Sequence, residues 1–196
     1  MEQKMVKELL LQSLEHEMGG TKVYETALKC VVNEDLKEEW EKYLEETEKH
    51  VQVLHDLCLQ MNLDPEEQTP GRKITHDMGA SLVAAMEAAL GSGEKEMAEC
   101  VAAECVVHAE TTDHFNWQLI GEVAEKMEGA EAKAMKEAYE EVEDEEDEHL
   151  YHSKGWLREL SLQGLGLKAQ LPPPEEKKKV KSASAQARVE QQARRR

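Results

Sequence analysis

Aromatic residues and long apolar runs are both scarce in this sequence. Phe, Trp and Tyr make up 4% of the 196 residues, and runs of β-branched residues, which favour strands, are rare. No segment approaches the ~18 consecutive apolar residues that span a bilayer, and the N-terminus is charged and amphipathic rather than a secretory leader. The abundant residues are Ala, Leu, Glu, Lys, Met and Gln, which form helices well. We therefore expect an all-α, soluble, cytoplasmic protein.

Paired cysteine motifs are also lacking. The sequence has four cysteines, with no C-x-x-C pair and no spacing typical of a secreted disulfide framework; they are Cys30, Cys58, Cys100 and Cys105. We expect reduced, buried thiols.

Positive charge is sparse except near the C-terminal end. The chain has 24 Lys and Arg against 42 Asp and Glu, but residues 168–196 hold nine basic and three acidic residues. Residues 1–167 therefore carry a formal charge of −24, which argues against nucleic acid as a partner of this part and favours cations. We expect residues 1–167 to form one helical domain. Residues 168–196, rich in Pro, Lys and Arg, should be flexible in isolation and able to dock an acidic partner.

Apolar residues recur at the three- and four-residue spacing of helices. This pattern predicts helices at about residues 3–31, 35–61, 77–90, 94–127 and 131–160. Asp35 is the expected cap of the second helix, and the Pro- and Gly-containing segment 62–76 is an expected loop. The pattern indicates two antiparallel hairpins, joined by a long connection that contains a short helix.

Glutamates and histidines fall at one level of these hairpins. Glu17 lies about 16 residues before the first turn and His50 about 17 after it, so an antiparallel arrangement brings them together. In the second hairpin Glu110 lies 18 residues before Glu128, while Glu146 and His149 lie 18 and 21 after it.

The helical periodicity also places these glutamates and histidines on the inward-facing side of each helix. Steps of three and four from Tyr43 reach His50, and steps from Val142 reach Glu146 and His149. Burying ionised carboxylates costs several kcal/mol each unless a cation or hydrogen bonds compensate. The layer therefore predicts a bound metal ion.

Two further features of the sequence support the prediction of a metal site. Glu146 and His149 form a Glu-x-x-His motif, and Tyr24 follows Glu17 by seven residues just as Trp117 follows Glu110. On these residues the chain, over about residues 3–160, resembles the ferritin-like di-iron family, including bacterioferritin and rubrerythrin.

The resemblance implies a four-helix bundle of two hairpins with a long crossover, and a homo-oligomer. It implies mono- or dinuclear iron, or another transition metal, bound by Glu17, His50, Glu110, Glu146 and His149. The implied activity is that of an oxidoreductase or ferroxidase, which oxidises Fe(II) or reduces O₂ or peroxide.

The first hairpin departs from the family pattern at Thr47, where a carboxylate is expected. Asp113 and His114 follow Glu110 by three and four residues, so either could supply a compensating ligand. An alternative stays open, in which the chain is a helical scaffolding or binding protein with a degenerate metal site.

The remaining histidines carry less information. We expect them on solvated helix or loop surfaces; they are His16, His55, His76, His108 and His152. His152, near the end of the last helix, follows His149 by three residues and could instead orient a ligand or bind the metal itself.

Overall fold

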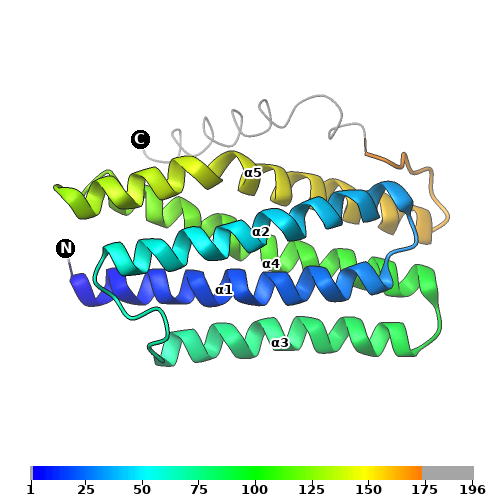
Figure 1. Cartoon of the computed structure of the whole chain (residues 1–196). Coiled ribbons are helices and arrows are strands. Elements are labelled where there is room, and N and C mark those ends of the chain that lie inside the picture. The colour runs from blue at the N-terminus through cyan, green and yellow to red at the C-terminus, as the bar shows by residue number, and fades with distance from the viewer. Residues whose placement is uncertain (1, 174–196) are drawn as a thin grey trace.

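The structure, a computed structural model, describes residues 2–173, and within this range the chain forms five helices and no strand. The helices are α1 (Gln3–Cys30), α2 (Glu34–Gln60), α3 (Pro70–Gly91), α4 (Lys95–Ala124) and α5 (Ala130–Gly164). They lie side by side and run in alternating directions, as Figure 1 shows. The predicted all-α class is confirmed. Most of the predicted flexible tail lies outside the described residues.

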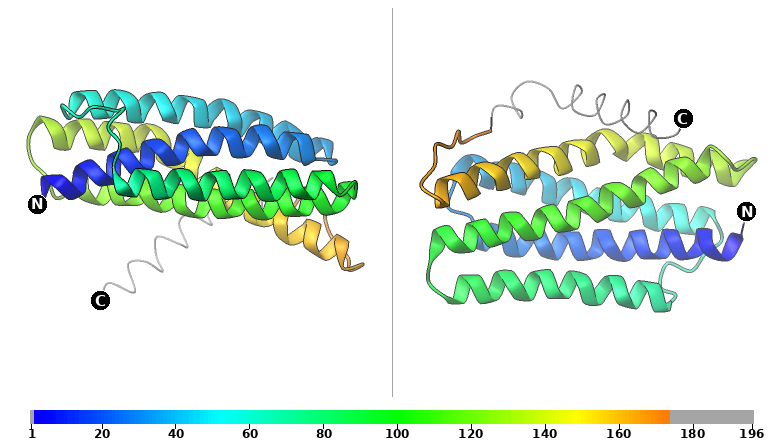
Figure 2. Two further views of the ribbon diagram at one scale, coloured as in Figure 1. Left: turned by 90° about the horizontal axis from the view of Figure 1, so that it is seen from below. Right: turned by 180° about the vertical axis from the view of Figure 1, so that it is seen from behind.

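Helix α1 occupies a central place among the helices. It packs against α2, α3 and α4, while α5 packs against α4 and α2. Helix α3 contacts only α1 and α4 among the other helices, and it lies on the outside of the assembly (Figures 1 and 2). It carries the chain from the end where α2 stops to the end where α4 begins.

Apolar side chains form two separate clusters along α1, α2, α4 and α5. One contains Tyr24, Tyr43 and Trp156, and the other contains Leu14, Leu54 and Trp117. On each of these four helices, the residues between the two clusters are largely polar or charged. The interior therefore consists of an apolar layer, a polar layer and a second apolar layer.

Two predicted helix starts are wrong. Helix α2 is capped by Asn33, whose Oδ1 accepts a hydrogen bond from the backbone N–H of Leu36 at 3.1 Å, rather than by Asp35. Helix α3 begins at Pro70 rather than at residue 77, with Thr69 as its cap. Pro70 occupies the first helical position, where the fixed φ of proline suits a helix and its missing N–H costs nothing.

The side chain of Arg72 links α3 to α1 through a hydrogen bond. Its side chain is 2% exposed, and its Nε–H donates to Glu15 Oε2 at 2.7 Å. The guanidinium also donates to the backbone carbonyls of Pro65 and Glu67. Burial alone would raise the pKa of Glu15, but the hydrogen bonds from Arg72 and His76 outweigh it, so the pKa is lowered. The carboxylate of Glu15 is therefore charged in the folded state.

Replacing Arg72 by Ala should lower the free energy of unfolding by about 3 kcal/mol, because it leaves the buried charge of Glu15 without its main partner. Urea denaturation at pH 7 measures this loss. Lys73→Ala is the matched control, since Lys73 forms an exposed ion pair with Asp77 at 3.0 Å, and it should cost less than about 0.5 kcal/mol. Equal losses in the two variants would contradict the role given to Arg72.

The four cysteines are free, and Cys30, Cys58 and Cys105 are buried. Between residues 2 and 173, no helix is both long enough and apolar enough to cross a membrane.

Candidate metal centre

The polar layer brings together six side chains from four helices. Glu17 comes from α1, His50 from α2, Glu110 and Asp113 from α4, and Glu146 and His149 from α5. We call these six residues the buried cluster. Each is at most 4% exposed. All five residues predicted from the sequence thus lie in one layer, and Asp113 joins them.

Glu146 lies between the two histidines. Its Oε1 is 3.0 Å from Nδ1 of His50 and 3.7 Å from Nδ1 of His149. Glu17 Oε1 lies 3.5 Å from Nδ1 of His50, and Glu110 Oε2 lies 3.7 Å from Nδ1 of His149. These distances are close enough for the side chains to share bound cations.

Two groups of three residues each offer ligand atoms within 4.8 Å of one another. The first is His50, Glu146 and His149, and the second is Glu17, Asp113 and Glu146. Glu146 belongs to both groups, so one carboxylate can link two neighbouring positions.

Many polar atoms of the buried cluster make no well-formed hydrogen bond with the described residues, although Glu146 Oε1 lies within ion-pair distance of both imidazoles. They are Oε2 of Glu17, Nδ1 of His50, Oε2 of Glu110, Oδ1 of Asp113, both carboxylate oxygens of Glu146, and Nδ1 of His149. Buried polar atoms are nearly always paired, and leaving one unpaired costs about 1–3 kcal/mol, more where it is charged. A cation held between these atoms would satisfy several of them at once.

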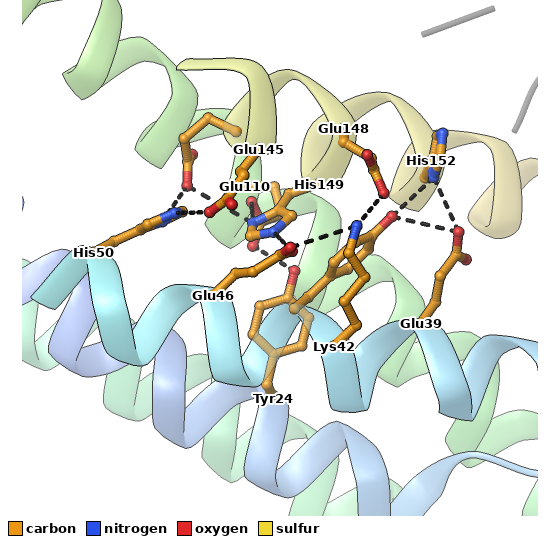
Figure 3. Close-up of polar contacts among 12 residues, drawn as sticks. Tyr24, Glu39, Lys42, Glu46, His50, Glu110, Glu145, Glu148, His149 and His152 are labelled. Carbon is orange, nitrogen blue, oxygen red and sulfur yellow. Dashed lines mark hydrogen bonds and ion pairs between the residues drawn. The ribbon is translucent and has the colours of Figure 1, made fainter. Parts of the chain in front are cut away.

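The outer nitrogens of both histidines contact carboxylates, as Figure 3 shows. His50 Nε2 lies 2.8 Å from Glu145 Oε2, and His149 Nε2 lies 3.0 Å from Glu46 Oε2. A carboxylate that accepts the Nε2 proton leaves Nδ1 available as a ligand atom and fixes the orientation of the ring. Both imidazoles are thereby held with Nδ1 towards the centre of the layer.

The two inner glutamates are oriented by aromatic side chains. Trp117 Nε1–H donates to Glu17 Oε1 at 2.7 Å, and the Tyr24 hydroxyl donates to Glu110 Oε1 at 2.7 Å. Both rings are 1% exposed and belong to the apolar core. Each hydrogen bond occupies one carboxylate oxygen and leaves the other, Oε2, without a partner.

The α1–α2 hairpin and the α4–α5 hairpin supply equivalent parts to this layer. The matching pairs are Glu17 with Glu110, Tyr24 with Trp117, Glu46 with Glu145, and His50 with His149. The equivalence fails at two pairs, Thr47 with Glu146 and Gly20 with Asp113. Thr47 and Gly20 are themselves neighbours, because a Cβ on Gly20 would lie 3.3 Å from Thr47 Cγ2. The carboxylate that Thr47 lacks therefore has no substitute on the first hairpin, whereas the second hairpin has one extra.

Burial and mutual repulsion shift the acid groups of the cluster. Burial raises the pKa of Glu110 to about 7, and it raises the pKa of Asp113 well above its usual range, with the charge of Glu17 adding to the effect. Burial would lower the pKa of His50, but Glu146 and Glu17 outweigh it and raise this pKa to about 11. Protons would therefore compete with any metal ion for these side chains.

The two outer carboxylates differ in their surroundings. Lys42 Nζ lies 3.5 Å from Glu46 Oε1 and 2.5 Å from Glu148 Oε1 (Figure 3). Glu145, in contrast, has a side chain 39% exposed, and no lysine or arginine of residues 2–173 lies within 4.0 Å of its carboxylate.

The prediction that His152 lies on the surface is wrong. It is 7% exposed because it faces α2, where its Nδ1 lies 2.8 Å from the Tyr43 hydroxyl and 2.9 Å from Glu39 Oε1. The Tyr43 ring in turn packs against His149, with ring centroids 4.3 Å apart.

The other histidines lie outside the buried cluster. His114 belongs to neither group of three ligand residues, and its Nε2 lies 2.7 Å from Asp147 Oδ1. His16 is partly buried, with Nε2 2.9 Å from the carbonyl of Ala109. The side chains of His55, His76 and His108 are 40%, 54% and 68% exposed, as predicted.

The geometry defines a class of site, a buried carboxylate and histidine cluster inside a helical assembly. Searches against family models, curated proteins and solved structures gave no significant match to this chain.

Proposed function

We propose that this chain is a ferritin-like protein that binds iron at the buried cluster and uses it to oxidise Fe(II) or to reduce O₂ or peroxide. The observation that carries the proposal is the set of unpartnered ligand atoms on six buried residues. The helix order supports it as well. In this proposal α1–α2 and α4–α5 are the two hairpins of a four-helix bundle, and α3 belongs to the crossover.

The donor set suits iron chemistry. Carboxylates and imidazoles bind both Fe(II) and Fe(III), and a site with few protein ligands per metal leaves positions for an oxidant. When bound, iron would supply the one- or two-electron redox step.

The residues of the chain have separate parts in this proposal. Glu146 links the two groups of ligands, while Trp117 and Tyr24 hold Glu17 and Glu110 with their Oε2 atoms free. Glu145 and Glu46 hold the two imidazoles in place through their Nε2 atoms. The surrounding apolar clusters keep bulk water from the layer.

His149→Ala should lower the iron content from about two ions per chain to one or fewer, because it removes one of the two nitrogen ligands of the buried cluster. Elemental analysis after anaerobic Fe(II) loading and desalting measures the content. His76→Ala is the control, since His76 contacts Glu15 at 2.8 Å, outside the buried cluster, and it should keep full iron content. Equal losses in both variants would reject the assigned ligands.

A second candidate function is a helical scaffold with a degenerate metal site. The raised pKa values of Glu110 and Asp113 favour it, because protons can neutralise the layer where a metal is absent. The same loading experiment separates the two candidates, since wild-type protein that retains no iron supports the scaffold. That the chain forms a homo-oligomer, and that its basic tail docks an acidic partner, both remain predictions.

A further inference from the structure

We propose that a pocket between α1, α3 and α4 binds a small, neutral organic molecule that has an apolar body and a hydrogen-bond donor, as a phenol has. The pocket has a volume of about 360 Å³, close to the lower end of the range for small-molecule sites. It is separate from the buried cluster, because none of the cluster residues lines it. The inference therefore does not rest on the proposed iron binding.

The pocket lies against the middle of α3, on the side that faces α1 and α4. Of the residues of α3, only Arg72 and Met86 are buried, and the part of α3 that lines the pocket, within residues 75–82, lies between them. Along this part the two backbones approach at glycines, since a Cβ on Gly79 would lie 3.7 Å from Gly19 Cα. Helix α3 is thus anchored on both sides of the pocket, with space left between the anchors.

Small and apolar residues form most of the pocket wall. They are Gly19, Gly20, Val23, Met78, Leu82 and Ala109. Gly19 is required neither by packing nor by backbone conformation, because a Cβ there would have no atom within 4 Å and its φ is not positive. Glycine is also less favourable than alanine inside a helix. The absence of a side chain at this position therefore leaves space open at the pocket.

The polar side chains of the pocket wall have their donor hydrogens engaged within the protein. The hydroxyls of Thr75, Ser81 and Thr112 each donate to a backbone carbonyl of their own helix. His16 Nε2 lies 2.9 Å from the carbonyl oxygen of Ala109, which can only accept, so Nδ1 of the neutral ring is an acceptor. These four groups can still accept a hydrogen bond, which suits a ligand that donates one.

The charges at the pocket disfavour an anion. Glu15 lines it, whereas Arg72 and His76, which pair with Glu15, do not. No lysine or arginine of residues 2–173 belongs to the wall. His108, at the edge, is 68% exposed and lies 4.0 Å from Glu104. An apolar wall likewise disfavours ions of either sign, because a charge loses its hydration there. A neutral molecule is therefore the best match.

Titration of β-naphthol into the full metal-free chain at mildly alkaline pH tests the proposal. Naphthol fluorescence should report saturable binding, and the largest changes in amide NMR shifts should fall at Gly19, Gly20 and Gly79. The methyl ether of β-naphthol has the same rings and no donor, so it should bind about fivefold more weakly, the factor expected for one lost hydrogen bond. The anion β-naphthoate should also bind at least about fivefold more weakly.

Gly19→Leu should weaken β-naphthol binding at least about tenfold, because the new side chain takes up space in the pocket. The fold should be kept, since leucine forms helices better than glycine does. Gly91→Leu is the matched control. Gly91 is also a helical glycine with open space around a built Cβ, but it lies at the end of α3 and outside the pocket, so binding should be unchanged. Circular dichroism checks the helix content of both variants.

Three results would each overturn the inference. They are the absence of saturable β-naphthol binding up to about 1 mM, equal affinity for the methyl ether, and unchanged binding by Gly19→Leu. Loss of binding in Gly19→Leu alone, together with the preference for β-naphthol over its ether, supports it. Iron content is a separate readout, because wild-type protein that binds β-naphthol and retains no iron supports this inference and contradicts the metal-binding proposal.

Discussion

Anaerobic Fe(II) at about 1,000 times its dissociation constant will raise the midpoint of thermal unfolding by about 10 °C. At that excess a ligand that binds only the folded state stabilises it by about 4 kcal/mol, and 1 kcal/mol corresponds to about 2–4 °C for a chain of this size. The physical reason is that metal-free protein buries four carboxyl groups and two imidazoles in one layer with many atoms unpartnered. Scanning calorimetry with and without Fe(II) measures the shift.

Glu146→Gln should remove most of that shift, because Glu146 belongs to both groups of ligands. Glu141→Gln, an exposed position five residues earlier on α5, should keep it. A midpoint that rises equally in the two variants would show that Fe(II) acts elsewhere on this acidic protein.

Metal affinity will rise by at least about tenfold for each pH unit between about 6 and 8. Near pH 7 the metal-free cluster holds a proton on His50, whose pKa is raised to about 11, while burial raises the pKa of Asp113 well above its usual range. The proton on His50 must be released before both imidazoles can bind a cation, and each released proton adds a factor of about ten per pH unit. Glu110, with a pKa of about 7, adds part of a further proton. Titration calorimetry in buffers of different ionisation enthalpy counts these protons, and affinity that is flat with pH would contradict the prediction.

The free energy of unfolding of metal-free protein should fall as pH rises towards neutrality, whereas metal affinity rises. Glu110 and Asp113 have raised pKa values, so the folded state binds more protons than the unfolded state, and stability falls as pH rises from about 4 through 7. The contribution of His50 is complete below about 6.5 and is lost as pH rises through about 11. The pKa values of Glu46 and Glu146 are lowered, so their contributions are lost as pH falls below about 4.5. Metal-free protein is therefore expected to be most stable in mildly acidic solution.

The long helices and the level of the polar layer could be predicted from the sequence because both depend on distance along the chain. A helix rises by a constant amount per residue, so counting from the turns places Glu17, His50, Glu110 and His149 at one height. The inward phase follows from the same regularity.

The start of α3 and the burial of His152 could not be predicted in this way. Pro70 and Gly71 occur in loops as often as at helix starts, and the choice here depends on contacts of Arg72 with Glu15, 57 residues away in sequence. His152 is buried because it faces α2 and contacts Glu39 and Tyr43 there, residues 113 and 109 positions away in sequence.

The outer carboxylates were missed, although the sequence contains a signal for them. A glutamate precedes each histidine by four residues, as Glu46 precedes His50 and Glu145 precedes His149. Spacing within one helix suggests pairs within that helix, yet the contacts cross between helices, from His50 to Glu145 and from His149 to Glu46. Only the packing of α2 against α5 determines that exchange.

Lys42 makes the surroundings of the polar layer less negative at Glu46 than at Glu145. On one side its ammonium lies 3.5 Å from Glu46, the carboxylate that holds His149, and 2.5 Å from Glu148, so it offsets part of the negative charge there. On the other side Glu145, which holds His50, is 39% exposed and has negative neighbours along α5. A cation diffusing to the protein therefore meets a more negative potential at Glu145 than at Glu46. In the proposed metal site, we expect the two histidines to differ in kinetics although they hold equivalent places in their hairpins, with His50 exchanging its metal before His149.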